Sequence, residues 1–483
     1  MRQPSNDRAL YYRQLRDTIQ TLFLPELTSA QARDAAGLVD RILVEFIVEE
    51  EAAPALSAEF GAAFLETLEP RADVEHVAVT VARFHELRKR AADVVAGCAA
   101  SADGGDRQLG RGLVEIERHF LDRVDELRNA VFAEPVNNDA QPSANECSVT
   151  NAQVTDYLRR RLTNSPNVVA ERLSVVPGGR SKETILVSLA GTVELPDEVI
   201  LRKDRPVGLL QTKAADEYAV IKAVHDFGGV PIPEPFFAER EGHGLGDGTF
   251  VVMERMRGHK AGEFFPDLAA PAQHRQEIGL QLAASLARLH SLPLDRLGET
   301  SLDTNDAAVT EESVVGSVEA IVARIDELTG PPCATVYFAR EWLVEHVSDV
   351  VPAPRLCLLQ GDFGFHNMLV DGGRVSALVD WEAATIGPPA RELAAAWNPV
   401  TALMAWSDFV EAYVHAGGSR DDTDRRAISY YRVLSSLGGF MASRIGGHLF
   451  RTGAKRDLLT AHSGLDSHFR CARNLARTLG DAM

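Results

Sequence analysis

The sequence has few cysteines, no long apolar segment and no excess of basic residues, and each absence argues against a class of protein. Its 483 residues include five cysteines, which lie far apart and without CxxC spacing. The cysteines therefore indicate neither a disulfide framework nor a zinc site. No apolar run approaches the length that crosses a bilayer, and the polar N-terminus lacks the apolar core of a signal peptide. We therefore expect a cytoplasmic protein without a membrane partner.

The net charge of −19 argues against a nucleic-acid partner, because phosphate backbones are bound by basic surfaces. The acidic excess is densest in residues 1–150, where we find no catalytic motif. We therefore interpret the acidic excess as a contribution to solubility rather than as a sign of a cationic substrate. A chain of this length, with 45% hydrophobic residues, can form two or three domains with sizeable cores.

Helical periodicity dominates the first part of the chain and then stops. Apolar residues recur at helical spacing through residues 1–132, which we interpret as a helical N-terminal module without a catalytic constellation. Residues 133–151 are rich in Pro, Asn and Ser and poor in large apolar residues. This composition predicts a linker and marks the domain boundary that the sequence indicates best.

The second part of the chain predicts an α+β fold with two lobes. A short helix at 152–163 precedes β-branched runs at 173–176, 184–189, 198–202 and 249–256, with one helix before the last run. These elements predict a small β-rich lobe at 152–256. Residues 257–483 are mainly helical and predict a larger lobe.

An apolar strand in the larger lobe runs directly into polar residues. The stretch LLQGDFGFHNMLV, residues 358–370, places Asp362 and Asn367 five residues apart between two apolar runs. Residues 371–374 then read Asp-Gly-Gly-Arg between apolar runs, which predicts a β-hairpin with a two-residue turn.

The register of this hairpin suggests a metal site. A two-residue turn makes Asn367 face Leu378, and Asp380 follows two residues later on the same face. Such a diagonal spans about 7–8 Å, which two oxygen ligands can close around one cation. Asn367 and Asp380 would hold the metal and Asp362 would accept a proton from a hydroxyl, as Mg²⁺-dependent phosphoryl transfer requires. Taken one at a time, the same residues are also ordinary turn and strand-end residues.

The order of these residues resembles the aminoglycoside phosphotransferase and choline kinase superfamily. Gln360-Gly361-Asp362 with Asn367, then VDWE at 379–382 and GPPARELA at 387–394, is similar to its HGDxxxxN loop and the strand that follows. The most similar branch includes the kinase-like domain of some acyl-CoA dehydrogenases. The resemblance covers residues 151–483 and implies a protein-kinase-like fold. It also implies ATP and Mg²⁺ as cofactors, Asp362 as catalytic base, and Asn367 and Asp380 as metal ligands.

The small lobe offers further candidates for nucleotide binding. Backbone N–H groups of a turn at Gly178 and Gly179, with the neighbouring Ser181, could meet phosphate oxygens, although a plain hairpin explains the glycines equally well. The resemblance implies that a cation at the end of the third strand, Arg202 or Lys203, holds phosphate.

The resemblance implies two more parts of a nucleotide site. Glu217 on the next helix would pair with the strand cation. Backbone groups of Met253, Glu254 and Arg255 would meet the nucleotide base.

Two residues depart from the family pattern. Gln360 stands where the family usually has a histidine that orients the loop, and Glu392 stands where Asp is more frequent. We interpret Glu392 as structural support for the loop. His366, inside the loop, is either a substrate contact or a packed residue.

Three functions compete on the sequence alone. The first is a small-molecule kinase, with a hydroxylated acid, acyl thioester or other alcohol favoured over an aminoglycoside as the acceptor. The second is a pseudokinase or nucleotide-binding scaffold whose helical module docks a partner, which Gln360 and the unexplained N-terminal module favour. The third is a protein kinase. The helical module could form a homodimer, dock a partner or cover the active site, and the sequence does not choose between ATP and GTP.

Overall fold

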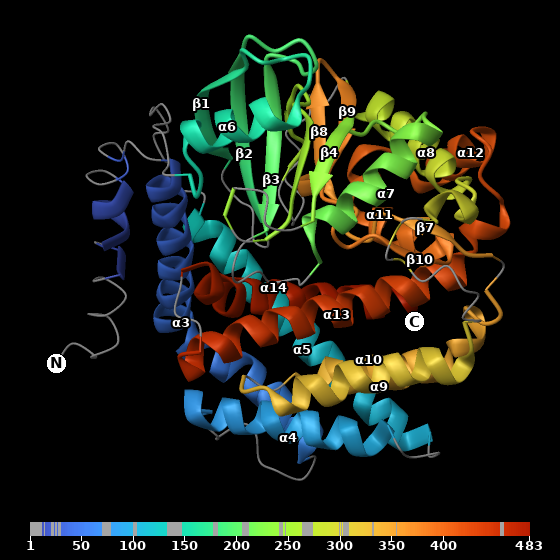
Figure 1. Ribbon diagram of the computed structural model, residues 1–483. Coiled ribbons are helices and arrows are strands. Elements are labelled where there is room, and N and C mark those ends of the chain that lie inside the picture. Colours follow the sequence, from blue (N-terminus) through green and yellow to red (C-terminus); the bar gives the residue numbers. More distant parts are fainter. Residues whose placement is uncertain are drawn as a thin grey trace. The chain divides into compact units, whose positions relative to one another are not determined.

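The structure of the protein is a computed structural model, shown in Figure 1. It describes the chain apart from residues 1–11, 14, 21–23, 25–26, 28–29, 70–78, 100–103, 133–146, 177–181, 205–211, 241–244, 247, 263–273, 299, 301, 303–308, 331–332, 354 and 455–457. Most of the predicted linker lies outside the described residues.

The chain forms two compact units that interleave along the sequence. The first unit comprises residues 1–143, 309–352 and 429–483, and the second comprises residues 144–308 and 353–428. This division differs from the predicted domains, because two segments of the predicted larger lobe fold with the N-terminal helices. Segments that are distant in sequence can share one core, which local periodicity does not reveal.

The first unit is helical in its described residues, as predicted for its N-terminal part. Its longest helix, α3, runs without interruption through Pro54. The helices of this unit are α3 (Ala30–Leu68), α4 (Val81–Ala99), α5 (Gly104–Phe132), α9 (Glu311–Glu327), α10 (Ala334–Glu345), the short η5 (Val347–Asp349), most of α13 (Arg425–Thr452) and α14 (Leu458–Ala482).

A buried carboxylate joins the sequence-distant segments of this unit. Glu117 on α5 accepts a hydrogen bond from Arg88 on α4, with 3.1 Å between Nη2 and Oε1. Its other oxygen accepts bonds from the backbone N–H and the hydroxyl of Thr335 on α10, at 2.9 and 2.7 Å. Because Glu117 is almost fully buried, removing it would leave a guanidinium in the core without its carboxylate partner.

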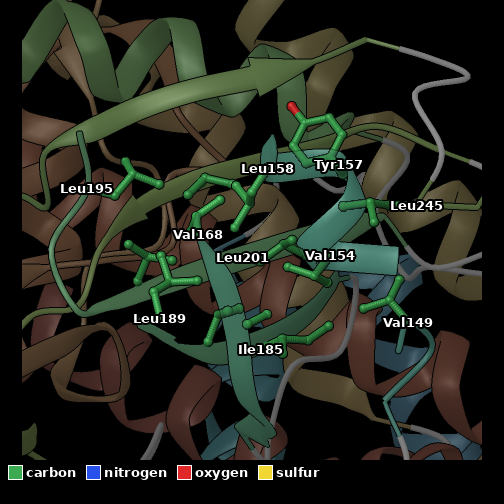
Figure 2. Packing of buried hydrophobic residues seen from close by; sticks show 14 of the residues in the cluster. Val149, Val154, Tyr157, Leu158, Val168, Ile185, Leu189, Leu195, Leu201 and Leu245 are labelled. Atoms are coloured by element: carbon green, nitrogen blue, oxygen red, sulfur yellow. The ribbon is translucent and has the colours of Figure 1, made fainter. Parts of the chain in front are cut away.

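The second unit begins with a five-stranded antiparallel sheet in the order β1-β2-β3-β5-β4 (Figure 1). α6 packs its apolar side chains on one face of the sheet, where Tyr157 and Leu158 belong to one core cluster with Ile185 and Leu201 (Figure 2). α7 contributes Glu217 to the opposite face. The elements are α6 (Asn151–Arg161), β1 (Val169–Val176), β2 (Lys182–Ala190), β3 (Glu198–Asp204), α7 (Ala214–Phe227), β4 (Pro235–Glu239) and β5 (Phe250–Glu254).

The structure has strands at each predicted β-branched run and adds β4. The sequence around this strand, IPEPFF, reads as a loop because proline cannot donate to a sheet ladder. β4 is an edge strand and starts at Pro235, which is where a sheet tolerates proline.

The rest of the second unit surrounds the polar motif. Its elements are β6 (His259–Lys260), α8 (Arg275–His290), η4 (Leu294–Leu297), β7 (Cys357–Leu359), η6 (Phe365–Asn367), β8 (Met368–Asp371), β9 (Arg374–Leu378), β10 (Thr385–Gly387), α11 (Pro389–Leu403), α12 (Trp406–His415) and η7 (Asp421–Thr423).

A buried polar network holds the ends of these elements together. The Tyr413 hydroxyl donates to Asp422 Oδ2 at 2.8 Å and lies 2.9 Å from His290 Nδ1. Arg355 donates to Asp422 and to the His290 carbonyl. Burial lowers the pKa of His290 to about 3, so its ring is neutral at physiological pH.

Across the described helices, we find none that is both long and apolar enough to span a bilayer.

We expect Glu117→Ala to lower the free energy of unfolding by about 3–5 kcal/mol, because it breaks a buried ion pair on one side. Urea unfolding of the full chain, followed by circular dichroism, measures this. The matched control is Glu115→Ala on the same helix, whose side chain is 49% exposed and should cost less than about 1 kcal/mol. Equal effects of the two variants would contradict the shared core.

Candidate active site

The predicted hairpin forms, but its register differs by one residue. Gly372 and Gly373 make the two-residue turn with φ angles of 54° and 82°, which glycine adopts without strain. β8 pairs Met368, not Asn367, with Leu378, because Ser376 is an extra, unpaired residue on β9. The backbone carbonyl of Asn367 instead accepts a hydrogen bond from the Val379 backbone N–H at 2.9 Å. The predicted register is therefore wrong at its open end.

Asp380 reaches the site through its backbone conformation rather than through strand alternation. β9 ends at Leu378, and Asp380 has a φ of 62°. This left-handed conformation is uncommon for residues other than glycine and is frequent at functional sites. The surrounding contacts must hold it.

Gln360 supplies those contacts and connects the two halves of the motif. Its Oε1 accepts the backbone N–H of Asp362 at 2.9 Å, and its Nε2 donates to the carbonyls of Val379 and Asp380 at 3.1 and 2.7 Å. The side chain is almost fully buried. Gln360 therefore fixes the Asp362 loop and the Asp380 segment relative to each other.

Glu392 supports the same loop from α11, as predicted. Its two oxygens accept the backbone N–H groups of Gln360 and Gly361, at 2.5 and 3.2 Å. Burial raises the pKa of Glu392 to about 7, although these two hydrogen bonds oppose the shift. The helix that carries it begins directly after Pro388.

In the loop, two side chains contact one carboxylate oxygen of Asp362. Oδ2 accepts a hydrogen bond from Asn367 Nδ2 at 2.9 Å and lies 3.1 Å from His366 Nε2. Asn367 Nδ2 also donates to the Asp362 carbonyl at 2.9 Å. The Asp362 side chain is 47% exposed, so an acceptor molecule can reach it.

Arg202 lies at the centre of a group of carboxylates. Its Nε donates to Glu217 at 3.0 Å, and its Nη2 donates to Asp380 at 2.5 Å and lies 3.6 Å from Glu382. Burial disfavours its charge, but the three carboxylates outweigh burial and raise the pKa of the guanidinium.

Glu217 binds more than the strand cation. Its Oε1 accepts the backbone N–H of Trp381 at 3.2 Å, so α7 is joined directly to the residue after Asp380. Burial raises the pKa of Glu217, and Arg202 offsets part of that shift.

Lys182 is a site cation that the sequence did not indicate. It lies at the start of β2 with 1% of its side chain exposed, and its Nζ donates to the Thr212 carbonyl at 2.6 Å and to Glu382 at 3.2 Å. β2 pairs Lys182 with Asp204 and Thr184 with Arg202. Opposite and alternate residues share a sheet face, so Lys182 and Arg202 point to the same side. This alternation was the available signal.

The structure separates Arg202 from Lys203. Lys203 pairs with Phe250 on β5 and is buried on the face that carries the apolar core of the sheet. It therefore does not join the Arg202 group.

The other residues predicted to contact the nucleotide lie at the end of β5 or outside the described residues. Met253 is buried on the Arg202 face of β5, opposite Ile200. The Glu254 backbone N–H donates to the Glu234 carbonyl at 2.8 Å, and the Arg255 side chain pairs with Glu198. Gly178, Gly179 and Ser181 lie outside the described residues.

The donors around Asp380 have the chemistry that Mg²⁺ prefers. Asn367 commits its amide nitrogen to Asp362, which assigns the other end of the carboxamide, Oδ1, as an acceptor. With the Asp380 carboxylate it offers hard oxygen ligands. Within the described ranges, no three His, Cys, Asp or Glu side chains form a ready metal cage. This is compatible with Mg²⁺, which usually takes remaining ligands from water and substrate phosphates.

Comparisons with known proteins agree with this geometry. A sequence profile described as "Phosphotransferase enzyme family" matches residues 172–429, just over half of the chain. Acyl-CoA dehydrogenase family member 11 from Rattus norvegicus is 29% identical over 205 residues, covering 40% of this chain and 24% of the relative. The Gallus gallus protein of the same name is 29% identical over 247 residues, covering 49% and 29%. The chain thus spans less than a third of the length of these relatives.

A solved structure confirms the expected fold. A Ralstonia eutropha protein assigned as an aminoglycoside phosphotransferase aligns with a TM-score of 0.53 at 14% identity, over 69% of this chain and 99% of that chain. The likeness confirms a kinase-like domain that contains the sheet, preceded by a helical N-terminal part.

We expect the contribution of Glu392 to the free energy of unfolding to fall as pH rises from about 4.5 to about 7. Its carboxyl has an ordinary pKa of 4.5 and a folded pKa of about 7, so in this window the folded state binds more protons than the unfolded chain. Each unit of difference between the folded and unfolded pKa corresponds to about 1.4 kcal/mol of stability. Glu392→Gln should flatten this part of the curve, measured by urea unfolding at a series of pH values.

The control for this pH series is Glu411→Gln, which changes a carboxylate that is 69% exposed. Its curve should follow that of the unchanged protein. If Glu392→Gln and Glu411→Gln show the same slope, the carboxyl of Glu392 does not titrate as described.

Proposed function

The chain belongs to the phosphotransferase enzyme family, and we propose that it transfers the γ-phosphate of ATP to a hydroxyl group of a small molecule. The hydroxyl oxygen forms a bond to the γ-phosphorus while the bond from that phosphorus to the bridging oxygen breaks. ADP leaves with the electron pair, and the hydroxyl proton passes to Asp362. Positioning and charge neutralisation carry most of such a reaction, because its transition state is loose.

One observation carries the proposal: the exposed carboxylate of Asp362 is held beside the mostly buried cluster of cations and carboxylates around Arg202. Gln360 connects Asp362 to the carbonyl of Asp380 through one side chain. Asp380 in turn binds Arg202. The base, a metal-type carboxylate and a phosphate-type cation are thus held in one connected group.

Arg202 and Lys182 are the cations that we assign to the nucleotide phosphates. Both lie on one face of the sheet, and Glu382 lies within 3.6 Å of Arg202 and 3.2 Å of Lys182. Two cations that share a carboxylate partner can turn toward phosphate oxygens without large movements. Charge-assisted hydrogen bonds of this kind are about twice as strong as neutral ones.

Mg²⁺ fits the oxygen donors of Asn367 and Asp380, and we propose these two residues as its protein ligands. When bound, the metal would neutralise phosphate charge. Asn367 has a second task in this chain, because its amide nitrogen holds the Asp362 carboxylate.

We propose a hydroxylated acid or acyl thioester as the acceptor, in preference to an aminoglycoside. The support is the similarity to acyl-CoA dehydrogenase family member 11.

The contacts of Gln360 weaken one of the two arguments for the scaffold alternative and leave the other, the N-terminal module, unchanged. That alternative was favoured by Gln360 in place of the usual histidine, because a loosely held loop would not catalyse. Gln360 makes three hydrogen bonds that fix the loop, so the substitution supplies the orienting contacts.

We expect the purified chain to phosphorylate at least one compound in a panel of hydroxy acids, hydroxyacyl thioesters and aminoglycosides with Mg²⁺ and ATP. Mass spectrometry detects the gain of phosphate. Asp362→Asn should lower turnover by about 100-fold or more. The control, Asp371→Asn at the exposed hairpin turn, should retain activity. No phosphate gain with ATP or GTP on any compound would contradict the assignment.

We expect Lys182→Met and Arg202→Met each to raise the Kd for Mg-ATP by about tenfold or more, since a hydrogen bond to a charged group contributes about 1.5–3 kcal/mol. Isothermal titration calorimetry measures the Kd. Lys203→Met is the matched control, because this lysine is also buried but lies on the opposite face. Equal weakening by all three changes would show that the sheet, rather than the assigned cations, determines binding.

A further inference from the structure

We propose that His366 is a positioning residue for Asp362, holding the carboxylate in the orientation that receives the acceptor hydroxyl. The inference rests on the proposed function and adds a residue to it. Neither the sequence motif nor the comparisons assign this role, and the sequence left His366 open between a substrate contact and a packed side chain. The geometry favours a third role, a direct contact with the reactive carboxylate.

The contact determines which imidazole nitrogen carries hydrogen. His366 Nε2 lies 3.1 Å from Asp362 Oδ2, and an ionised carboxylate can only accept a hydrogen bond. Nε2 therefore carries the hydrogen in the arrangement that we propose. Asn367 Nδ2 donates to the same oxygen at 2.9 Å. Two donors on Oδ2 fix the rotation of the carboxylate about its side-chain bond, and we assign Oδ1 to the hydroxyl.

The position of the ring depends on a gap at Gly364. A Cβ atom at this position would lie 2.7 Å from Cε1 and Nδ1 of His366, which is closer than such atoms pack. The backbone of Gly364 is extended, with φ of −170°, so another residue could adopt its conformation. Glycine is therefore required here to make room for the imidazole, not for backbone freedom.

The local turn also fixes the backbone position of His366. Residues 365–367 form the short helix η6, and its flanking side chains Phe365 and Asn367 are buried. The Asn367 backbone N–H donates to the Gly364 carbonyl at 3.1 Å. The His366 side chain is only 19% exposed. The His366 side chain is thus held at its backbone by η6 and at its ring by Asp362, so it can orient the Asp362 carboxylate.

The role requires no change in the protonation of His366 during the reaction. Asp362 accepts the hydroxyl proton, and the imidazole keeps its hydrogen on Nε2. Misplacing a reacting group by about 1 Å can lower a rate about 100-fold. Losing the donor should therefore affect turnover more than nucleotide affinity.

The test uses the full chain with Mg²⁺, ATP and water as the acceptor, so that no natural substrate is needed. His366→Phe keeps the ring shape and removes the donor. His366→Gln places an amide nitrogen where Nε2 lies. Gly364→Ala keeps the histidine and displaces its ring. Steady-state ATP hydrolysis gives kcat and KM, calorimetry gives the Kd for Mg-ATP, and thermal unfolding checks the fold.

We expect His366→Phe and Gly364→Ala to lower kcat about 10- to 100-fold while the Kd for Mg-ATP stays within about twofold of the unchanged protein, which follows if only the carboxylate is misplaced. His366→Gln should restore most of the activity. If both variants hydrolyse ATP like the unchanged protein, or if His366→Gln is as slow as His366→Phe, the positioning role is wrong.

A different result would contradict the proposed function itself. If the unchanged protein hydrolyses no ATP and transfers no phosphate to any acceptor, both the function and the role of His366 are wrong. If hydrolysis depends on Asp362 but not on His366 or Gly364, only the positioning role is overturned.

Discussion

The buried carboxamide of Gln360 is the contact on which the rest of the site depends. The loop that carries Asp362 and the segment that carries Asp380 connect strands that pair with one another, β7 with β10 and β8 with β9. Neither Asp362 nor Asp380 lies on a strand, so a further contact must set the distance between them. One planar amide does this with an acceptor on the loop side and a donor on the other. A neutral histidine also offers one acceptor and one donor. Glutamine meets the same need and adds a second donated bond, to Val379.

Two buried carboxylates also hold the segments that Gln360 connects. Glu392 holds the loop by two backbone N–H groups, and Glu217 holds the Asp380 segment by the backbone N–H of Trp381. Burying a carboxylate is costly unless its oxygens are satisfied. Both residues meet that condition by binding backbone rather than side chains alone, so each stabilises a local conformation as well as a charge.

Part of this arrangement could be predicted from the sequence, and each failure has a physical cause. The Asp-Gly-Gly-Arg turn follows from turn chemistry, whereas the resemblance implied the roles in the loop and its support by Glu392. The register failed because the extra residue, Ser376, has no sequence signal of its own. Lys182 was missed because its role depends on Glu382, which is 200 residues away. The unit boundaries were missed because local periodicity does not show which distant helices share a core.

The balance of charge in the Arg202 cluster favours some ligands of the proposed site over others. Arg202 and Lys182 already have carboxylate partners in Glu217, Asp380 and Glu382, so the cluster holds more carboxylates than cations. A lone phosphate would therefore meet repulsion as well as attraction. In the proposed reaction, a phosphate chain that arrives with a divalent cation would add positive charge and let each cation exchange one anionic partner for another. Asp380 is one of the residues that would hold this metal, and Gln360 connects the Asp380 segment to Asp362. Nucleotide binding and the positioning of Asp362 would then be coupled through one side chain.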